Sequence, residues 1–442
     1  MSSSPDPQTL QQLLVEAVRR HNVLPFTGLC NLSCCFCSHG QNPPGARAYT
    51  FPPLDTGRLL DLIPFLDPDQ KIIIGESATR LREGEPLTHP DFFTILERLR
   101  RHCPDTLIQV TTNGSLLDGD AVRRLAALKP LELVLSLNSA TGRGRRLLMN
   151  DPRPATAAVE KIIEAGIPLH GSVVALPHLV GWDDLQYTLE FLDGAGAKTI
   201  RLLMPGFTRI TPPGMIPPPD TVERCRELAG RLRQDFSTPL LLEPPLVDDF
   251  DPFIEGIIAG SPAAGVGLKT GDLILRVNDY TPVSRVDAFH RAREAQDPCL
   301  TVLRHHRQLQ LSLAKKKDES PGFTVSYDLD PAQLERVRRC LRPGQETLML
   351  VSPAAYPLWL LARESFGLEG LSLVAVQPLF FGGNIRCAGL LTVSDFAAAL
   401  RQHQSPGRVL VPAVAFDSGG RDMQGHHFSR LNAEGVAVIL VE

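Results

Sequence analysis

The stretch Cys30-Asn31-Leu32-Ser33-Cys34-Cys35-Phe36-Cys37 places four cysteines within eight residues. Read through Cys30, Cys34 and Cys37, its spacing is C-x3-C-x2-C. Thiolates this close in the chain can converge on one metal centre without help from distant segments, and thiolates bind both iron–sulfur clusters and zinc. A cubane cluster normally has four thiolate ligands, so one held by three keeps an iron free for a ligand that is not protein.

Other interpretations of this stretch remain open. The nearest cysteine outside it is Cys103, and cysteines are common in cores as small apolar residues, although four within eight residues is a rare accident. A structural zinc ion would use the same thiolates and a fourth ligand, which His39 could supply. The register C-x4-C-x-C, which includes Cys35, is conceivable. We expect Cys35 to point away from its neighbours and to bind nothing.

Composition excludes several classes of protein. The chain has 442 residues, 43% hydrophobic and 21% charged, with a net charge of −4, which is typical of a globular protein with two or three domains. The near-neutral balance offers no basic field to nucleic acid or to a membrane surface, and no apolar run is long enough to span a bilayer. Residues 1–12 are too polar for a signal peptide. Nine unevenly spaced cysteines do not suggest a disulfide framework, so we expect a cytoplasmic protein.

Apolar runs alternate with amphipathic segments through the first half of the chain. The runs Lys71–Ile74 and Leu107–Thr111 are short, and segments such as Asp118–Leu128 have helical periodicity. This alternation predicts an α/β fold in which parallel strands are covered by helices. Counted from a first strand at His21–Phe26, roughly six to seven units fit, fewer than a closed eight-unit barrel needs.

Polar residues follow the predicted strands, at the edge where parallel sheets and barrels bind ligands. After Ile74 the chain carries Gly84-Glu85-Pro86, whose carboxylate and backbone carbonyls are suitable acceptors for an ammonium group. Taken alone, Gly-Glu-Pro is a weak signal and is more often a simple helix N-terminus. The next strand ends carry Asn113, then Ser136 and Asn138, and Asn113-Gly114 is also a common turn signal.

The cysteine spacing, the aromatic Phe36 before the last thiol and the later Gly84-Glu85-Pro86 together resemble the radical S-adenosylmethionine (SAM) superfamily. The resemblance covers residues of about 20–245 and implies a partial (β/α)6 radical SAM barrel, here expected over 1–245. It implies a [4Fe-4S] cluster on the three thiols, whose free iron chelates SAM. Its implied ligands are Cys30, Cys34 and Cys37 for the metal, and Gly84, Glu85, Pro86, Asn113, Ser136 and Asn138 for SAM. Glu83 stands where the family usually has a glycine.

The resemblance implies an anaerobic enzyme that uses an electron to cleave SAM into methionine and a 5′-deoxyadenosyl radical, which abstracts hydrogen from a substrate C–H bond. A donor such as flavodoxin or ferredoxin would supply the electron. The substrate, a small molecule or a peptide, and the catalytic residues are not indicated. The alternative is an iron–sulfur or zinc protein that senses redox state or assembles partners. Gly84-Glu85-Pro86 discriminates between them, because a sensor needs no site for the SAM amino group.

Residues 250–317 resemble a PDZ domain, a small, mainly β module. The resemblance rests on Gly256–Ala264, Leu268–Asp279 and an amphipathic segment at Val286–Ala295. Such domains capture peptide C-termini by strand addition. Here no glycine-rich carboxylate loop is visible, and the chain is acidic at that point, at Asp248, Asp249, Asp251 and Glu255. We therefore expect intramolecular packing rather than peptide binding.

Residues 321–442 are expected to form a C-terminal α/β domain of unknown role. Within them, Phe380–Thr392 resembles part of the uncharacterised C-terminal domain of bacterial radical SAM/PDZ Fe-S oxidoreductases. In that family the PDZ module usually precedes the radical SAM region, whereas here it follows. Glycines flanked by apolar residues suit a segment that another backbone or a ligand approaches closely.

Overall fold

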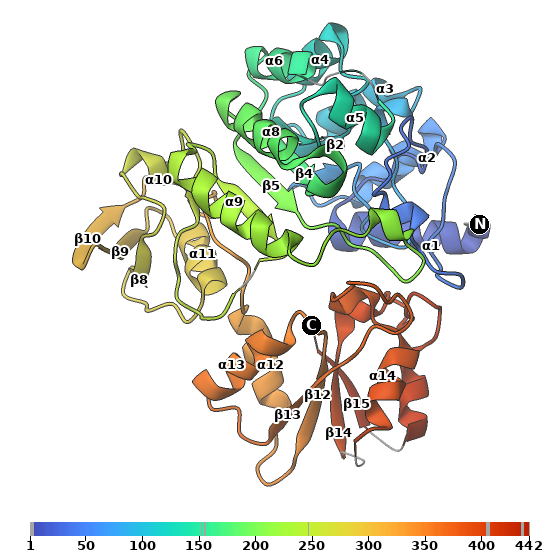
Figure 1. The fold of residues 1–442 in the computed structure, drawn as a ribbon, viewed down its shortest axis with the longest axis vertical. Helices are drawn as coiled ribbons and strands as arrows, with labels where there is room; N and C mark the ends of the chain where they lie inside the picture. Colours follow the sequence, from blue (N-terminus) through green and yellow to red (C-terminus); the bar gives the residue numbers. More distant parts are fainter. Residues whose placement is uncertain are drawn as a thin grey trace. The chain divides into compact units, whose positions relative to one another are not determined.

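The chain divides into two compact units, Met1–Pro205 with Ile210–Glu243, and Gly206–Arg209 with Pro244–Glu442 (Figure 1). The structure is a computed structural model, and it describes residues 4–151, 153, 156–245, 247–403, 407–434 and 437–441. Each unit is built around its own sheets, so each is described separately.

A six-stranded parallel sheet, ordered β1-β2-β3-β4-β5-β6, forms the centre of the first unit (Figure 1). Its strands are β1 Ile72–Ile74, β2 Ile108–Thr112, β3 Leu131–Ser136, β4 Leu169–Val174, β5 Thr199–Leu203 and β6 Leu240–Glu243. The helices are α1 Pro7–His21, α2 Thr56–Leu62, α3 Phe92–His102, α4 Gly119–Ala126, α5 Gly142–Met149, α6 Thr156–Glu164, α7 Pro177–Val180, α8 Trp182–Gly194 and α9 Thr221–Asp235. Short 3-10 turns lie at Ser38–Gly40, Ile63–Phe65, Pro86–Thr88 and Pro213–Met215.

One face of this sheet packs against the helices. Alternate strand residues are fully buried in a single core that also holds apolar residues of α1, α3, α8 and α9; they include Ile74, Val110, Leu133, Val173 and Leu202. Strands in chain order with helices on one face are the arrangement of a partial barrel. The predicted α/β fold is therefore confirmed.

The prediction of a first strand at His21–Phe26 is wrong. Val23 makes only an isolated parallel bridge to Ile73, supported by a hydrogen bond from the Leu24 amide to the Ile73 carbonyl at 2.9 Å. Pro25 follows at once and has no N–H to donate, so the ladder cannot continue through it. The segment still runs beside β1 and delivers the cysteine stretch to the sheet edge.

The other face of the sheet carries a polar network. Lys71 Nζ lies 2.7 Å from a Glu132 carboxylate oxygen, and the second Glu132 oxygen lies 3.5 Å from His170 Nε2. His170 Nδ1 in turn lies 2.8 Å from Thr199 Oγ1. Burial alone would raise the pKa of Glu132, but hydrogen bonds from His170 and Lys71 outweigh it and lower that pKa to about 2. The part of this face around Glu132 is therefore ionised and hydrogen-bonded.

The second unit contains an antiparallel sheet β10-β9-β8, a two-stranded pair β11-β7 and a four-stranded parallel sheet β13-β12-β14-β15 (Figure 1). Its strands are β7 Gly256–Ile257, β8 Leu273–Val277, β9 Cys299–Arg304, β10 Arg307–Ser312, β11 Phe323–Thr324, β12 Thr347–Val351, β13 Leu371–Ala375, β14 Arg408–Pro412 and β15 Ala437–Val441. The helices are α10 Pro262–Gly265, α11 Arg285–Glu294, α12 Pro331–Cys340, α13 Tyr356–Ser365 and α14 Val393–Leu400, with 3-10 turns at Ala388–Leu390, Ala413–Ala415 and Phe428–Glu434.

Helices cover both faces of the four-stranded sheet. Figure 1 shows α12 and α13 on one side and α14 on the other. Trp359 of α13 packs with Met349 in one core, while Phe396 of α14 packs with Leu350 in a second. This three-layer arrangement is a doubly wound α/β domain. In the described part of the chain, no helix is both long and apolar enough to cross a membrane.

Candidate functional site

The cysteine loop, residues 30–37, is anchored to helix α5. The Cys35 amide donates to the Leu148 carbonyl at 2.8 Å, and the Cys37 amide donates to the Cys34 carbonyl at 3.2 Å, closing a turn. Apolar side chains of the loop join a small cluster with α5 and α7; its members are Leu32, Cys34, Phe36, Leu148, Met149, Leu176, Leu179 and Val180, together with Val174 of β4. The helix that follows β3 thus fixes the position of the thiols.

The thiols at Cys30, Cys34 and Cys37 lie close enough to influence one another. Burial raises the pKa of Cys34 to about 12, and the neighbouring charges of Cys30 and Cys37 add to this effect. The pKa of Cys35 is also raised by burial, but no charge from Cys30 or Cys37 contributes to it. The charge of Cys35 also raises the pKa of Cys34, so all four thiols of the loop lie near one another. All four are free thiols, and Cys30 is exposed.

Backbone pairing brings Gly84-Glu85 against the segment that leads into Cys30. The Gly84 amide donates to the Thr27 carbonyl at 2.7 Å, and the Glu85 amide donates to the Leu29 carbonyl at 2.8 Å. A Cβ on Gly84 would lie 1.8 Å from the Leu29 carbonyl oxygen, so only glycine allows this approach. The Gly-Glu-Pro stretch and the first thiol, far apart in the sequence, are therefore neighbours.

The Glu85 carboxylate is buried and accepts hydrogen bonds from two neutral groups. Its Oε1 accepts from Thr112 Oγ1 at 2.7 Å, and its Oε2 accepts from the Asn113 amide at 2.7 Å. Only 3% of Glu85 is exposed, and burial raises its pKa despite these hydrogen bonds. No cation contributes to that pKa. A buried carboxylate without a cationic partner is electrostatically suited to bind one.

Of the predicted strand-end residues, Asn113 lies beside the cysteine loop, whereas Asn138 and Ser136 contact β4. Asn113 Nδ2 lies 3.8 Å from Cys30 Sγ and donates to Asn31 Oδ1 at 3.1 Å, so it lies between the cysteine loop and Glu85. Asn138 has a left-handed backbone (φ 59°), and its Oδ1 accepts from the Val174 amide at 2.9 Å. Asn138 therefore ties the ends of β3 and β4 together. Ser136, the last residue of β3, is partly exposed and pairs in register with Ser172.

Arg145 is a residue of this site that the sequence reasoning missed. Its guanidinium is completely buried, donates to the carbonyls of Leu137 at 3.1 Å and Asn113 at 3.2 Å, and lies 2.9 Å from the Asp151 carboxylate. Its positive charge also lowers the pKa of Cys34, against the larger effect of burial. The available signal was its spacing: Arg145 shares one face of α5 with Leu148 and Met149, where an apolar residue is expected.

A second cation, Arg82, lies beside the last thiol. It donates to the His39 carbonyl at 2.5 Å and to Thr50 Oγ1, and the charge of Cys37 acts to raise its pKa against the larger effect of burial. Burial and Arg82 together lower the pKa of the His39 ring. Among the described residues, no group of three or more His, Cys, Asp or Glu side chains converges as a formed metal site. Neither the three thiols alone nor the thiols with His39 are therefore gathered into a formed ligand set in this structure.

The sequence between residues 24 and 192 matches the sequence model of the Radical SAM superfamily. This segment is similar to the radical SAM domain. The matched range includes the cysteine loop, the Gly84-Glu85-Pro86 stretch and strands β1 to β4. A search among curated proteins gave no match.

Solved structures resemble the radical SAM domain and its surroundings only distantly. Streptococcus suis SuiB bound to S-adenosylmethionine is 16% identical over 53% of this chain and 55% of that chain, with a TM-score of 0.40. Native anSMEcpe with bound AdoMet is 14% identical over 50% of this chain and 62% of that chain, with a TM-score of 0.39. A radical SAM methyltransferase from Sphaerobacter thermophilus is 16% identical over 57% of this chain and 69% of that chain, with a TM-score of 0.38. The chain spans 55% of that SuiB chain, and the assignment rests on the match over residues 24–192.

The radical SAM family uses a [4Fe-4S] cluster and SAM, and residues of this domain suit both. The free thiols of Cys30, Cys34 and Cys37 are soft ligands of the kind that iron–sulfur clusters require. The buried Glu85 carboxylate, which has no cationic partner in the described part of the chain, suits an ammonium group such as that of SAM. Arg82 and Arg145 place positive charge near thiols that would carry negative charge when bound to metal.

We expect alanine at Cys30, Cys34 or Cys37 to abolish cluster binding, and alanine at Cys35 to spare it. Each of the first three would leave the cluster one thiolate short. The measurement is iron and sulfide content after anaerobic reconstitution, where the unchanged protein should hold about four of each. Loss of the cluster in Cys35→Ala, with retention in Cys34→Ala, would show that the register is wrong.

We expect Glu85→Ala to weaken SAM binding about ten- to hundredfold, because it removes a charge-assisted contact worth roughly 1.5–3 kcal/mol. Glu85→Gln removes the charge while keeping one oxygen for Thr112 or Asn113, so it separates the charge from the structural role. Equilibrium dialysis of SAM, with iron content as a check on the cysteine loop, measures both. Glu160→Ala, an exposed position on α6, is the matched control. Unchanged SAM affinity in both Glu85 variants would exclude Glu85 from the SAM site.

Proposed function

We propose that this protein is a radical SAM enzyme that binds a [4Fe-4S] cluster through Cys30, Cys34 and Cys37. The observation that carries the proposal is the pairing of Gly84-Glu85 with Thr27–Leu29, which places a buried carboxylate next to the first thiol. When bound, the cluster supplies one electron that cleaves SAM to methionine and a 5′-deoxyadenosyl radical, which takes a hydrogen atom from a substrate C–H bond.

In this proposal the chain's own residues bind and orient. Glu85 receives the SAM amino group, between backbone contributed by Gly84 and Pro86. Asn113 and Ser136 approach the rest of SAM, while Asn138 and Arg145 act as positioning residues, since their polar groups hold strand ends together. A 5′-deoxyadenosyl radical attacks whatever is nearest, so a fixed arrangement of these strand ends is a chemical requirement.

His178 is a candidate contact for the substrate. It lies in α7, directly after β4 and beside the cluster of apolar residues that holds Cys34. Both of its ring nitrogens are shielded, and neither has a side-chain hydrogen-bond partner among the described residues. Burial lowers its pKa, against a smaller opposing effect of a hydrogen bond with the Met215 backbone. An imidazole that leaves a ring nitrogen for a ligand is suited to a polar ligand group.

The electron would come from a small donor such as flavodoxin or ferredoxin. Cys30 is exposed, and its neighbour Leu29 is half exposed as an apolar side chain. Weak electron-transfer partners use small contact areas, so we place the donor beside these two exposed residues.

The activity is tested by incubating the reconstituted protein with dithionite and SAM. We expect 5′-deoxyadenosine and methionine to form even without the substrate, and to be absent from the Cys34→Ala variant. Liquid chromatography with mass spectrometry measures both products. A reconstituted protein that holds its cluster and SAM yet forms no 5′-deoxyadenosine would favour the alternative, an iron–sulfur redox sensor or scaffold.

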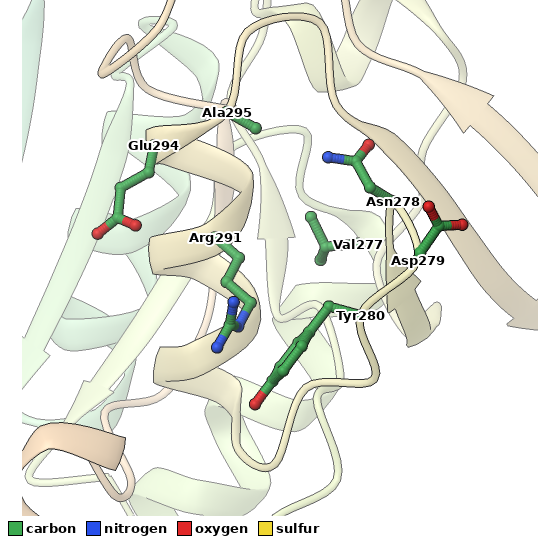
Figure 2. Close-up of a pocket in the computed structure, with 7 residues that line it drawn as sticks. All are labelled: Val277, Asn278, Asp279, Tyr280, Arg291, Glu294 and Ala295. Atoms are coloured by element: carbon green, nitrogen blue, oxygen red, sulfur yellow. The ribbon is translucent and has the colours of Figure 1, made fainter.

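The PDZ-like segment has a polar pocket, shown in Figure 2, that is poorly suited to a peptide carboxylate. Its one cation, Arg291, lies 3.2 Å from the centre of the Tyr280 ring and 2.8 Å from an Asp287 oxygen. Asp279 and Glu294 add negative charge to the lining. We infer that this segment packs within the protein rather than recruiting a peptide C-terminus.

Fluorescence anisotropy with the full chain tests this inference. We expect no saturable binding from a library of C-terminal peptides at protein concentrations of about 50 μM. Binding that disappears when the peptide carboxylate is amidated would contradict it, and would make a protein or peptide substrate the leading hypothesis.

A further inference from the structure

The second unit includes four residues, Gly206–Arg209, that in sequence lie between β5 and α9 of the first unit. They are bound by the turn Phe380-Phe381-Gly382-Gly383-Asn384, a motif of the C-terminal segment that the proposed function does not use. We call Met204–Thr211 the β5 strap and Phe380–Asn384 the glycine turn.

Backbone and amide hydrogen bonds join the glycine turn to the β5 strap. Asn384 Oδ1 accepts from the Phe207 amide at 2.7 Å, and the Asn384 amide donates to the Phe207 carbonyl at 3.0 Å. The Arg209 amide donates to the Phe381 carbonyl at 2.8 Å. The Arg209 guanidinium also lies 5.7 Å from the centre of the Phe380 ring. Asn384 thus satisfies both polar groups of one peptide residue, as a β-strand partner would.

The glycines of the turn are shaped for this contact. Gly383 has φ 64°, and a Cβ there would lie 2.1 Å from the Phe207 carbonyl oxygen. Gly382 has φ 65°, and a Cβ there would lie 2.9 Å from Arg209 Cβ. Both positions therefore combine a left-handed backbone with a close approach by the strap, and a side chain would be excluded on both grounds.

The two ends of the β5 strap belong to the first unit. The Met204 amide donates to the Glu243 carbonyl at 2.7 Å, which continues the β5–β6 ladder. Thr211 Oγ1 donates to Gln41 Oε1 at 2.9 Å, and Gln41 Nε2 reaches the Phe36 carbonyl at 3.4 Å. Phe36 precedes the last thiol of the cysteine loop. The chain therefore connects the glycine turn to the cysteine loop through covalent bonds and named hydrogen bonds.

We propose that the glycine turn is a clasp for the β5 strap, and that through Thr211 and Gln41 it positions the Cys37 end of the cysteine loop. Asn384 is a positioning residue in this scheme. The fastening itself is independent of the proposed function, while its importance for catalysis rests on the cysteine loop holding the cluster. The C-terminal domain would thereby have a defined task in the same chain as the radical SAM domain.

Hydrogen exchange of the full-length protein without metal tests the clasp. In Asn384→Ala, the amides of Phe207 and Arg209 should exchange about three- to tenfold faster, because each hydrogen bond contributes roughly 1 kcal/mol. Trypsin should also cleave after Arg209 sooner. Asn384→Asp keeps an oxygen for the Phe207 amide and should retain protection there. Asn432→Ala, an exposed asparagine of the same unit, is the matched control. Unchanged exchange at residues 206–209 in Asn384→Ala would overturn the clasp.

The connection to the cysteine loop needs a second variant. Thr211→Val removes the hydroxyl that donates to Gln41 and keeps the side-chain shape. We expect both Thr211→Val and Asn384→Ala to speed exchange in residues 36–42, but only Asn384→Ala to speed it at residues 206–209. If the exchange of residues 36–42 is unchanged in both variants, the positioning role is wrong, even if faster exchange at residues 206–209 supports the clasp. If Asn384→Ala does not fold, Asn384→Ser, whose hydroxyl is too short to replace Oδ1 at the Phe207 amide, takes its place in both comparisons.

These outcomes separate the inference from the proposed function. Faster exchange in the variants of a protein that never forms 5′-deoxyadenosine would support the clasp and refute the enzyme. If the protein forms 5′-deoxyadenosine but Asn384→Ala leaves the exchange unchanged, the enzyme is supported and the clasp is refuted.

Discussion

The backbone pairing between Thr27–Leu29 and Gly84-Glu85 is the constraint on which the site depends. It joins the chain just before the first thiol to the residues that follow β1, and it tolerates no side chain at position 84. Because Glu85 is then tied to the end of β2 through Thr112 and Asn113, three successive segments are fixed by one short ladder. The thiols and the buried carboxylate become neighbours as a result of this pairing.

Buried charge is the second element that organises the site. Arg145 reaches the carbonyls at the ends of β2 and β3 from a helix that also anchors the cysteine loop. Taking a guanidinium out of water is costly unless charge and hydrogen bonds compensate. Asp151 and the two carbonyls do so for the terminal nitrogens of Arg145, while its Nε is buried without a partner among the described residues. Removing Asp151 alone would leave an uncompensated cation, so the pair must be treated as one unit in any mutational study.

The sequence was informative wherever local chemistry decides structure. The alternation of apolar runs predicted the parallel sheet, and the spacing of the thiols and of Gly84-Glu85-Pro86 indicated the radical SAM family that the match over residues 24–192 supports. It was less informative where partners are distant. The first strand was reduced to a bridge by Pro25, and Arg145 looked like one more surface cation of α5. The strap and its clasp could not be predicted, because Phe207 and Asn384 are 177 positions apart and neither carries a local signal for the other.

The same separation has a consequence for the order in which the protein is made. The strands β1 to β6 pair in chain order, so their sheet can form once residue 243 has left the ribosome. Asn384 comes 177 positions after Phe207, which at about 5–20 residues per second corresponds to roughly 9–35 s of synthesis. During that interval the cysteine loop is complete, while the strap that reaches Gln41 has no clasp to close on.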